Sequence, residues 1–251
     1  MSDPEPTRER LRPLPPAFYA RPGFLSRPGV GDWWTLLHPP YTLWHLSYVV
    51  IGACLVGPVD AGRLAWTLLA FFLAVGIGAH ALDEIAGQPL NTGIPPRTLL
   101  VAGAASVAVP VVVGLVYAGW RLLPFVVVGA VLVVGYNLEL GHGVLHNGVG
   151  FALGWGAFPV LTGFYAQDFR LSVAALVAAG GAFILSVAQR TLSLRVRALR
   201  RRTQSVQGKI VGTGGEVTEL DQETLLAPLE GALQLIAGGL VCLAVALVLS
   251  R

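Results

Sequence analysis

Three potential metal ligands, His80, Asp83 and Glu84, lie close together where a long apolar stretch of the sequence ends. On a helix, positions i, i+3 and i+4 share one face, so we expect the three side chains to point the same way. The carboxylates would lie at the negative end of the helix dipole, where a bound cation would remove an electrostatic conflict. Acidic residues at the edge of a membrane span indicate a functional site. The alternative is a polar helix end that neighbouring loops satisfy.

A second group of potential ligands follows further along the chain. Glu139 and His142 form an E-x-x-H step, and His146 lies one helical turn later. Helix bundles use Glu-x-x-His pairs to hold two iron or manganese ions. Gly141 and Gly143 disfavour a helix here, so a loop could present these ligands instead. The alternative is a set of interfacial histidines that bind water and backbone. Together with His45, these two groups of side chains could hold one or two transition-metal ions. The predicted metal ligands are His45, His80, Asp83, Glu84, Glu139, His142 and His146.

A run of arginines, QRTLSLRVRALRRRTQ, follows a later apolar segment. Arg190, Arg197 and Arg201 would share one helix face, which predicts either a helix extension held to anionic headgroups or a clamp for a phosphate or diphosphate. The glycine-rich segment 208–220 lacks the order of a phosphate-binding loop and is predicted as a hairpin or flexible loop. Nothing in the sequence indicates nucleic-acid binding.

The composition places these groups in a membrane protein. Of 251 residues, 54% are hydrophobic and 12% are charged, whereas soluble domains average about 25% charged residues. The apolar runs have the length of membrane-spanning helices rather than the alternation of a barrel. We therefore expect an all-α polytopic helix bundle with about seven transmembrane helices, at 41–57, 64–81, 98–118, 122–138, 149–167, 172–189 and 227–249.

Charge distribution predicts the orientation of these helices. With seven spans and a cytoplasmic N-terminus, 13 of the basic residues would lie inside and 4 outside, as the positive-inside rule requires. Segment 1–39 is predicted as a cytoplasmic or interfacial arm and 40–251 as the transmembrane domain, with a cytoplasmic loop at about 191–226. We expect a multi-pass protein of the cell membrane, with every histidine near the cytoplasmic side.

Three sequence segments, in this order, resemble the UbiA-type superfamily of intramembrane prenyltransferases. HPPYTLWHLSYVVIGACL resembles the opening helix of that family, and HALDEIAGQPLNTGIPPRTLL occupies the place of its first aspartate-rich motif. YNLELGHGVLHNGVGFALGWGAFPVLTGFYAQ is similar to the segment after the fourth helix. The resemblance covers roughly residues 36–170, and the order of the segments is its most specific feature.

The resemblance implies transfer of a prenyl group from a diphosphate to an acceptor, with Mg²⁺ joining acidic motifs to the diphosphate. It makes Asp83 a metal-binding aspartate, with Glu84 beside it. We expect Asp83, Glu84 and Glu139 to be catalytic, and the three arginines of one face, Arg190, Arg197 and Arg201, to bind the anionic group. The sequence departs from the family at Ala79-His80, where Asn-Asp is usual, and after the sixth apolar run, where arginines replace a second acidic motif.

Three functions are therefore predicted. The first is a UbiA-like enzyme that transfers or processes an isoprenoid or lipid diphosphate with a divalent metal, Mg²⁺ by resemblance. The second is a metal-dependent lipid-modifying enzyme on the same scaffold that uses His and carboxylate ligands for Fe or Mn. The third is a membrane protein that binds a lipid or a partner without catalysis. The sequence predicts a lipid or isoprenoid substrate and contacts with membrane lipids, and it does not indicate an oligomeric state.

Overall fold

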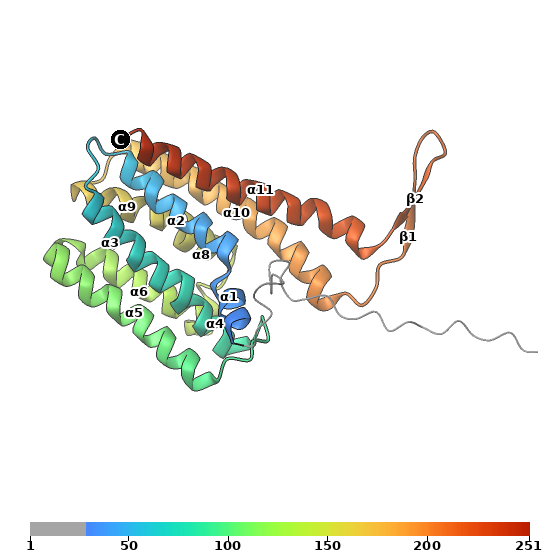
Figure 1. Cartoon of the computed structure of the whole chain (residues 1–251), viewed down its shortest axis with the longest axis horizontal. Helices are drawn as coiled ribbons and strands as arrows, with labels where there is room; N and C mark the ends of the chain where they lie inside the picture. The colour runs from blue at the N-terminus through green and yellow to red at the C-terminus, as the bar shows by residue number, and fades with distance from the viewer. Residues whose placement is uncertain (1–28) are drawn as a thin grey trace, which may run out of the picture.

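The computed structural model describes residues 29–251, which form a helical bundle with one β-hairpin (Figure 1). In chain order the elements are α1 (Val30–Leu37), α2 (Pro39–Cys54), α3 (Ala61–Phe71), the π-helical η2 (Phe72–Ala79), α4 (His80–Gly87), α5 (Pro96–Ala118), the 3-10 turn η3 (Gly119–Leu122), α6 (Leu123–Asn137), α7 (Leu140–Gly143), α8 (Gly148–Ala152), the π-helical η4 (Leu153–Ala157), α9 (Phe158–Asp168), α10 (Val173–Arg202), β1 (Gly208–Val211), β2 (Val217–Leu220) and α11 (Gln222–Leu249). The predicted N-terminal arm lies outside the described residues as far as residue 28, and its remainder contains α1.

The predicted fold class, an all-α polytopic membrane bundle, is confirmed. Large apolar side chains of α5 point outwards, as Val101 and Val112 do at 68% and 58% exposure, which suits lipid rather than water. In residues 29–251, the segments long and apolar enough to cross a membrane are Ala61–Gly87, Pro96–Val116, Gly119–Asn137, Gly148–Asp168, Val173–Arg202 and Gln222–Leu249.

The first predicted span differs from these six. It forms α2, a helix of 16 residues, which is about 24 Å long at 1.5 Å per residue and shorter than the ~30 Å hydrocarbon core. This helix lies among other helices, and Trp44, Tyr48 and Val49 on it are at most 1% exposed. Helices α9 and α11 pack directly against it. The buried apolar side chains of α2 therefore pack against other helices and form part of the protein core.

Glycines allow α2 and α9 to touch backbone to backbone. A Cβ atom at Gly52 would overlap the carbonyl oxygen of Val160, and one at Gly163 would overlap that of Val49. Such close approach of small residues is a common way to join helices in membranes.

Two helices contain π-helical turns, which are rare and often mark functional positions. Segment η2 joins α3 to α4 directly before His80, and η4 joins α8 to α9. Val75 of η2 and Trp155 of η4 belong to one apolar cluster. Both irregular turns therefore contribute to the same part of the apolar core.

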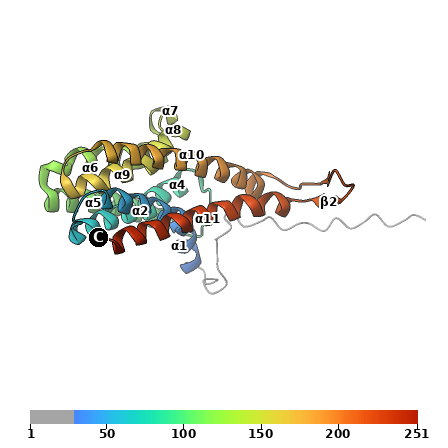
Figure 2. The same ribbon diagram turned by 90° about the horizontal axis from the view of Figure 1, so that it is seen from above.

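Helices α10 and α11 project together beyond the bundle and end at the β-hairpin (Figures 1 and 2). The hairpin fulfils the prediction for 208–220. The connection predicted at 191–226 is shorter, because α10 continues to Arg202 and α11 begins at Gln222. Arg200 and Glu230 join the two helices through a paired ion bridge whose second bond, from Nη2 to Oε2, measures 2.9 Å.

Candidate functional site

Polar side chains gather at the end of the bundle from which α10 projects. They come from the start of α2, from α4, from the end of α6, from the α7–α8 segment and from α10. We call this group the polar cluster, and its members are His38, His80, Asp83, Tyr136, His146, Arg190, Arg197 and Arg201.

Asp83 is the acidic member of the polar cluster. Its half-buried carboxylate interacts electrostatically with His146, Arg197 and Arg201. The positive charges of the last turns of α10 therefore act on this carboxylate of α4, although the two segments are far apart in the sequence. The arginine run of α10 lies where it can compensate the charge of Asp83.

Glu84, next to Asp83 in the sequence, has a different environment. It is 1% exposed, and its Oε2 accepts a hydrogen bond from the backbone N–H of Leu90 at 3.0 Å. Its Oε1 accepts from the backbone N–H and the hydroxyl of Thr92 at 2.7 and 3.0 Å. Both oxygens hold the loop after α4, which is the structural alternative considered for this group. To bind a metal, Glu84 would have to give up these bonds.

The E-x-x-H step does not form a helical face. Glu139 and His142 have φ angles of 51° and 61°, in the left-handed region, so the backbone turns away from a helix here. His142 is exposed, and the side chain of Glu139 is 64% exposed. Glu139 and His142 therefore lie on a turn rather than on a helical face, and the glycine between them, Gly141 at φ 62°, permits this turn.

His146, which follows that step in the sequence, belongs to the polar cluster. Its ring stacks on Tyr136 with 4.5 Å between centroids, and its Nδ1 lies 3.0 Å from the carbonyl oxygen of Tyr136. Glu139 Oε1 lies 3.9 Å from the same nitrogen. Tyr136 in turn accepts a 2.6 Å hydrogen bond from Nη1 of Arg190 through its hydroxyl. An aromatic residue thus links the loop to α10.

Two further histidines take different positions. His80 lies 4.5 Å from His38 between ring centroids, and its Nδ1 lies 3.1 Å from the carbonyl oxygen of Gly76. His45 is buried, with its Nδ1 2.7 Å from the carbonyl oxygen of Trp155 in η4. His80 therefore belongs to the polar cluster, whereas His45 ties α2 to η4.

The predicted metal ligands are thus divided among several places. No group of three or more His, Cys, Asp or Glu side chains in residues 29–251 is arranged to hold a metal ion. Mg²⁺ in enzymes is often held by one or two carboxylates together with substrate phosphates. At the polar cluster, Asp83 is the carboxylate available for such a role. The residues do not form a metal site of their own, so a metal here would depend on a phosphate-bearing ligand.

The arginines of α10 face the polar cluster as one stripe. Arg190 also lies over the ring of Phe151, with 5.3 Å to the centroid. Within residues 29–251, neither Arg190 nor Arg197 forms an ion pair with a carboxylate at 4.0 Å or less. Arg195 and Arg202 lie on another face of α10; they are exposed, as Arg197 is, whereas Arg190 and Arg201 are half-buried. The cluster therefore carries guanidinium charge suited to an anion.

Tyr136 and His38 were not predicted as site residues. His38 precedes Pro39 and Pro40 and adopts φ 45°, which ends α1 and separates it from α2. Its ring lies beside that of His80. The Pro-Pro pair is a sequence signal for that break. Tyr136 has no such signal, because its role depends on Arg190, 54 residues away.

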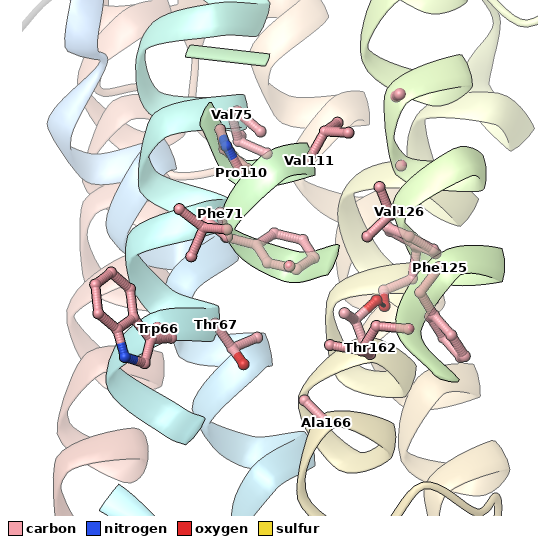
Figure 3. Close-up of a pocket in the computed structure, with 18 of the residues that line it drawn as sticks. Trp66, Thr67, Phe71, Val75, Pro110, Val111, Phe125, Val126, Thr162 and Ala166 are labelled. Carbon is pink, nitrogen blue, oxygen red and sulfur yellow. Dashed lines mark hydrogen bonds between the residues drawn. The ribbon is translucent and has the colours of Figure 1, made fainter. Parts of the chain in front are cut away.

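The structure also contains an apolar cavity that sequence analysis did not predict. The cavity measures about 360 Å³ and lies between α3, η2, α5, α6 and α9. Figure 3 shows side chains of these helices, among them Phe71, Val126 and Thr162, around a common space. Val75, Val133 and Trp155 close its inner end, and they share an apolar cluster with Tyr136. A layer of side chains therefore separates the cavity from the polar cluster.

Comparison of the chain with protein-family models, curated proteins and solved structures finds no match. The resemblance to UbiA-type enzymes stays a prediction. The polar cluster and the apolar cavity are the two features from which a function can be argued.

Proposed function

We propose that this integral membrane protein is a divergent UbiA-like enzyme that binds the phosphate or diphosphate head of an isoprenoid or related lipid at the polar cluster. The observation that supports the proposal is that Asp83 lies within electrostatic range of Arg197 and Arg201 of α10, beside two histidines, at one end of an apolar bundle. Arginine binds phosphate oxygens through paired N–H groups and stays charged under all physiological conditions.

The arrangement suits chemistry in which negative charge develops on a leaving group. Guanidinium groups of Arg190, Arg197 and Arg201 would neutralise the oxygens of a departing diphosphate, and fixed charges in a partly dry site do this better than water. The hydroxyl of Tyr136, already bonded to Arg190, would be oriented by the same group. Asp83 would accept a proton from the acceptor or position it.

We further propose that the polar cluster faces the cytoplasm, on the basis of the 13-to-4 distribution of basic residues. The test uses single cysteines at Ser205, beyond α10, and at Gly57, at the opposite end of the bundle, in a background without native cysteines. A membrane-impermeant thiol reagent should label position 57 in intact cells and position 205 only after lysis. The reverse pattern would place the cluster outside.

Binding of the head group is tested with purified protein in detergent. Farnesyl diphosphate should raise the unfolding midpoint, and farnesol should do so much less. Arg197→Gln should remove the difference between the two ligands, whereas the matched control Arg195→Gln, on another face of α10, should keep it. Equal responses of both variants, or equal effects of diphosphate and alcohol, would refute the proposed site.

Catalysis is tested separately by release of pyrophosphate from the same diphosphate in the presence of membrane lipids, with and without Mg²⁺. Release that Arg197→Gln abolishes supports the enzyme. Binding without release in every condition would leave the protein as a lipid-binding member of the same fold. Dependence on Mg²⁺ would show that a phosphate-bearing ligand brings the metal to Asp83.

A further inference from the structure

The lining of the apolar cavity extends to the end of the bundle opposite the polar cluster. Its lining includes Asp60 and Arg63, where α3 begins, and Phe169, just after α9 ends. Its inner end, at Val75, is twelve residues further along α3 and η2 than Arg63, which corresponds to about 18 Å. That length is comparable with the ~15 Å half-thickness of a hydrocarbon core.

The inside of the cavity presents almost no free polar group. Thr67 and Thr162 are the hydroxyl-bearing residues of its lining. Thr67 donates to the carbonyl oxygen of Arg63 at 2.7 Å, and Thr162 donates to that of Phe158 at 2.8 Å. Both hydroxyl groups therefore donate their hydrogen bond to a backbone carbonyl oxygen of their own helix. An occupant of this space gains from hydrocarbon contact. The other side-chain N–H donors of the lining belong to Arg63 and Trp66, in the first turns of α3, and to Trp155 of η4.

The mouth of the cavity, in contrast, is cationic and aromatic. The guanidinium of Arg63 lies 4.8 Å from the centre of the Phe169 ring, and that of Arg121 lies 5.3 Å from it. Asp60 caps α3 and lies 3.7 Å from Arg63, so it compensates part of that charge. Arg121 has no carboxylate within ion-pair distance in residues 29–251.

Trp120, beside Arg121, is 80% exposed. Tryptophan at the end of a membrane helix lies at the level of the lipid headgroups. The mouth is therefore at the depth where a lipid phosphate would be found.

We propose that this cavity is a lipid-binding site, separate from the polar cluster, that takes the hydrocarbon chain of an anionic lipid inside and its phosphate at Arg63 and Arg121. The largely apolar walls favour a hydrocarbon chain, and the cationic mouth favours a phosphate. A volume of about 360 Å³ falls within the range of ligand pockets, about 300–1,000 Å³, and suits one chain rather than two.

The test measures binding to purified protein in detergent by native mass spectrometry and by the unfolding midpoint. Oleoyl-lysophosphatidic acid carries both the chain and the phosphate, monooleoylglycerol carries the chain alone, and glycerol phosphate carries the head alone. We expect binding and stabilisation by the first probe and much weaker effects from the other two. Equal effects of the two single-chain probes would overturn the assignment of the phosphate to the mouth. An effect of glycerol phosphate as large as that of the full lipid would overturn the role of the cavity.

Three variants test whether the lipid binds in the apolar cavity. Arg121→Gln should weaken binding of oleoyl-lysophosphatidic acid about tenfold, as expected for one charge-assisted contact. Ala130→Leu places a larger apolar side chain in the cavity wall and should abolish chain binding with the apo midpoint unchanged or higher. Arg170→Gln, an exposed arginine near the same end, is the matched control and should bind like wild type. Binding that Arg121→Gln and Ala130→Leu leave intact would refute the site.

The inference does not depend on the proposed function, and Arg197→Gln separates the two. It should abolish the response to farnesyl diphosphate at the polar cluster and leave the response to oleoyl-lysophosphatidic acid unchanged. Loss of both responses in Arg197→Gln would mean that one site serves both ligands, and the separate cavity site would then fall.

Discussion

The sharpest distinction in the structure is between Asp83 and Glu84, and the substitution Glu84→Gln tests it. The glutamine keeps the size of the side chain, and its one acceptor oxygen can still receive the two donors of Thr92. Its amide N–H₂ would then lie opposite the backbone N–H of Leu90. Both groups are hydrogen-bond donors, so the buried N–H of Leu90 would lose its acceptor.

The magnitude follows from those contacts. A hydrogen bond to a charged group contributes about 1.5–3 kcal/mol, and an unsatisfied buried N–H costs about 1–3 kcal/mol. Allowing for relaxation of the loop, we expect Glu84→Gln to lower the free energy of unfolding by about 2–4 kcal/mol. For a chain of this size that corresponds to a midpoint about 5–15 °C lower. Asp83→Asn should lower it by less than half as much, because the Asp83 carboxylate accepts no hydrogen bond from a loop in the part of the chain that the structure describes.

The assay combines thermal unfolding in detergent with amide hydrogen exchange at residues 88–93. Glu84→Gln should speed exchange at Leu90 and Thr92, and Asp83→Asn should leave exchange there unchanged. The reasoning is refuted if Glu84→Gln unfolds and exchanges like wild type while Asp83→Asn loses stability. That result would return Glu84 to the predicted ligand set.

Gly163→Ala should disrupt the bundle, because the new Cβ would overlap a carbonyl oxygen of α2, whereas Gly180→Ala adds a methyl group in open space; equal midpoints for the two would contradict the close contact. Desolvation, with His80 and two arginines of α10, holds the pKa of His38 well below its usual 6.5. As the pH falls, His38 is therefore protonated in the unfolded chain at a higher pH than in the folded protein. The free energy of unfolding should fall as the pH drops through about 6.5. His38→Asn tolerates the left-handed backbone and should flatten the dependence of the midpoint on pH; a variant with the wild-type slope would exclude His38 as its source. Asp221 accepts from Thr224 as the N-cap of α11, so Asp221→Ala should cost about 1 kcal/mol in thermal unfolding, and no loss would show that α11 does not need its cap.

Long apolar runs predicted the helices well, because hydrophobic length is a property of each segment alone. The same property could not show that α2 is a core helix. That distinction depends on Gly163 and Val160, which approach α2 from more than a hundred positions away in the chain. The hairpin at 208–220 was open to prediction because its glycine-rich turn is local.

The candidate site was predictable only in part. Helical spacing correctly placed Arg190, Arg197 and Arg201 on one face, since α10 is a regular helix through all three. Spacing failed for Glu84 and His142, where the backbone leaves the helix or a loop folds back on the side chain. His45 could not be assigned either, because its partner is the carbonyl oxygen of Trp155, 110 residues later. The cavity has no sequence signal, since it arises from the spaces between five segments.

The enclosed position of α2 has a consequence for biosynthesis. The ribosome makes α2 before α3, α9, α10 and α11, which pack against it, and the carbonyl oxygen to which His45 binds is 110 residues away. At about 5–20 residues per second, this segment waits for about 5–20 s before its partner in η4 exists. During that time a short helix with polar groups such as His45 has no fitting neighbours. We therefore expect the insertion machinery to retain α2 near the translocation channel until α9 emerges. The packing of the other helices around α2 would then be a late step of folding.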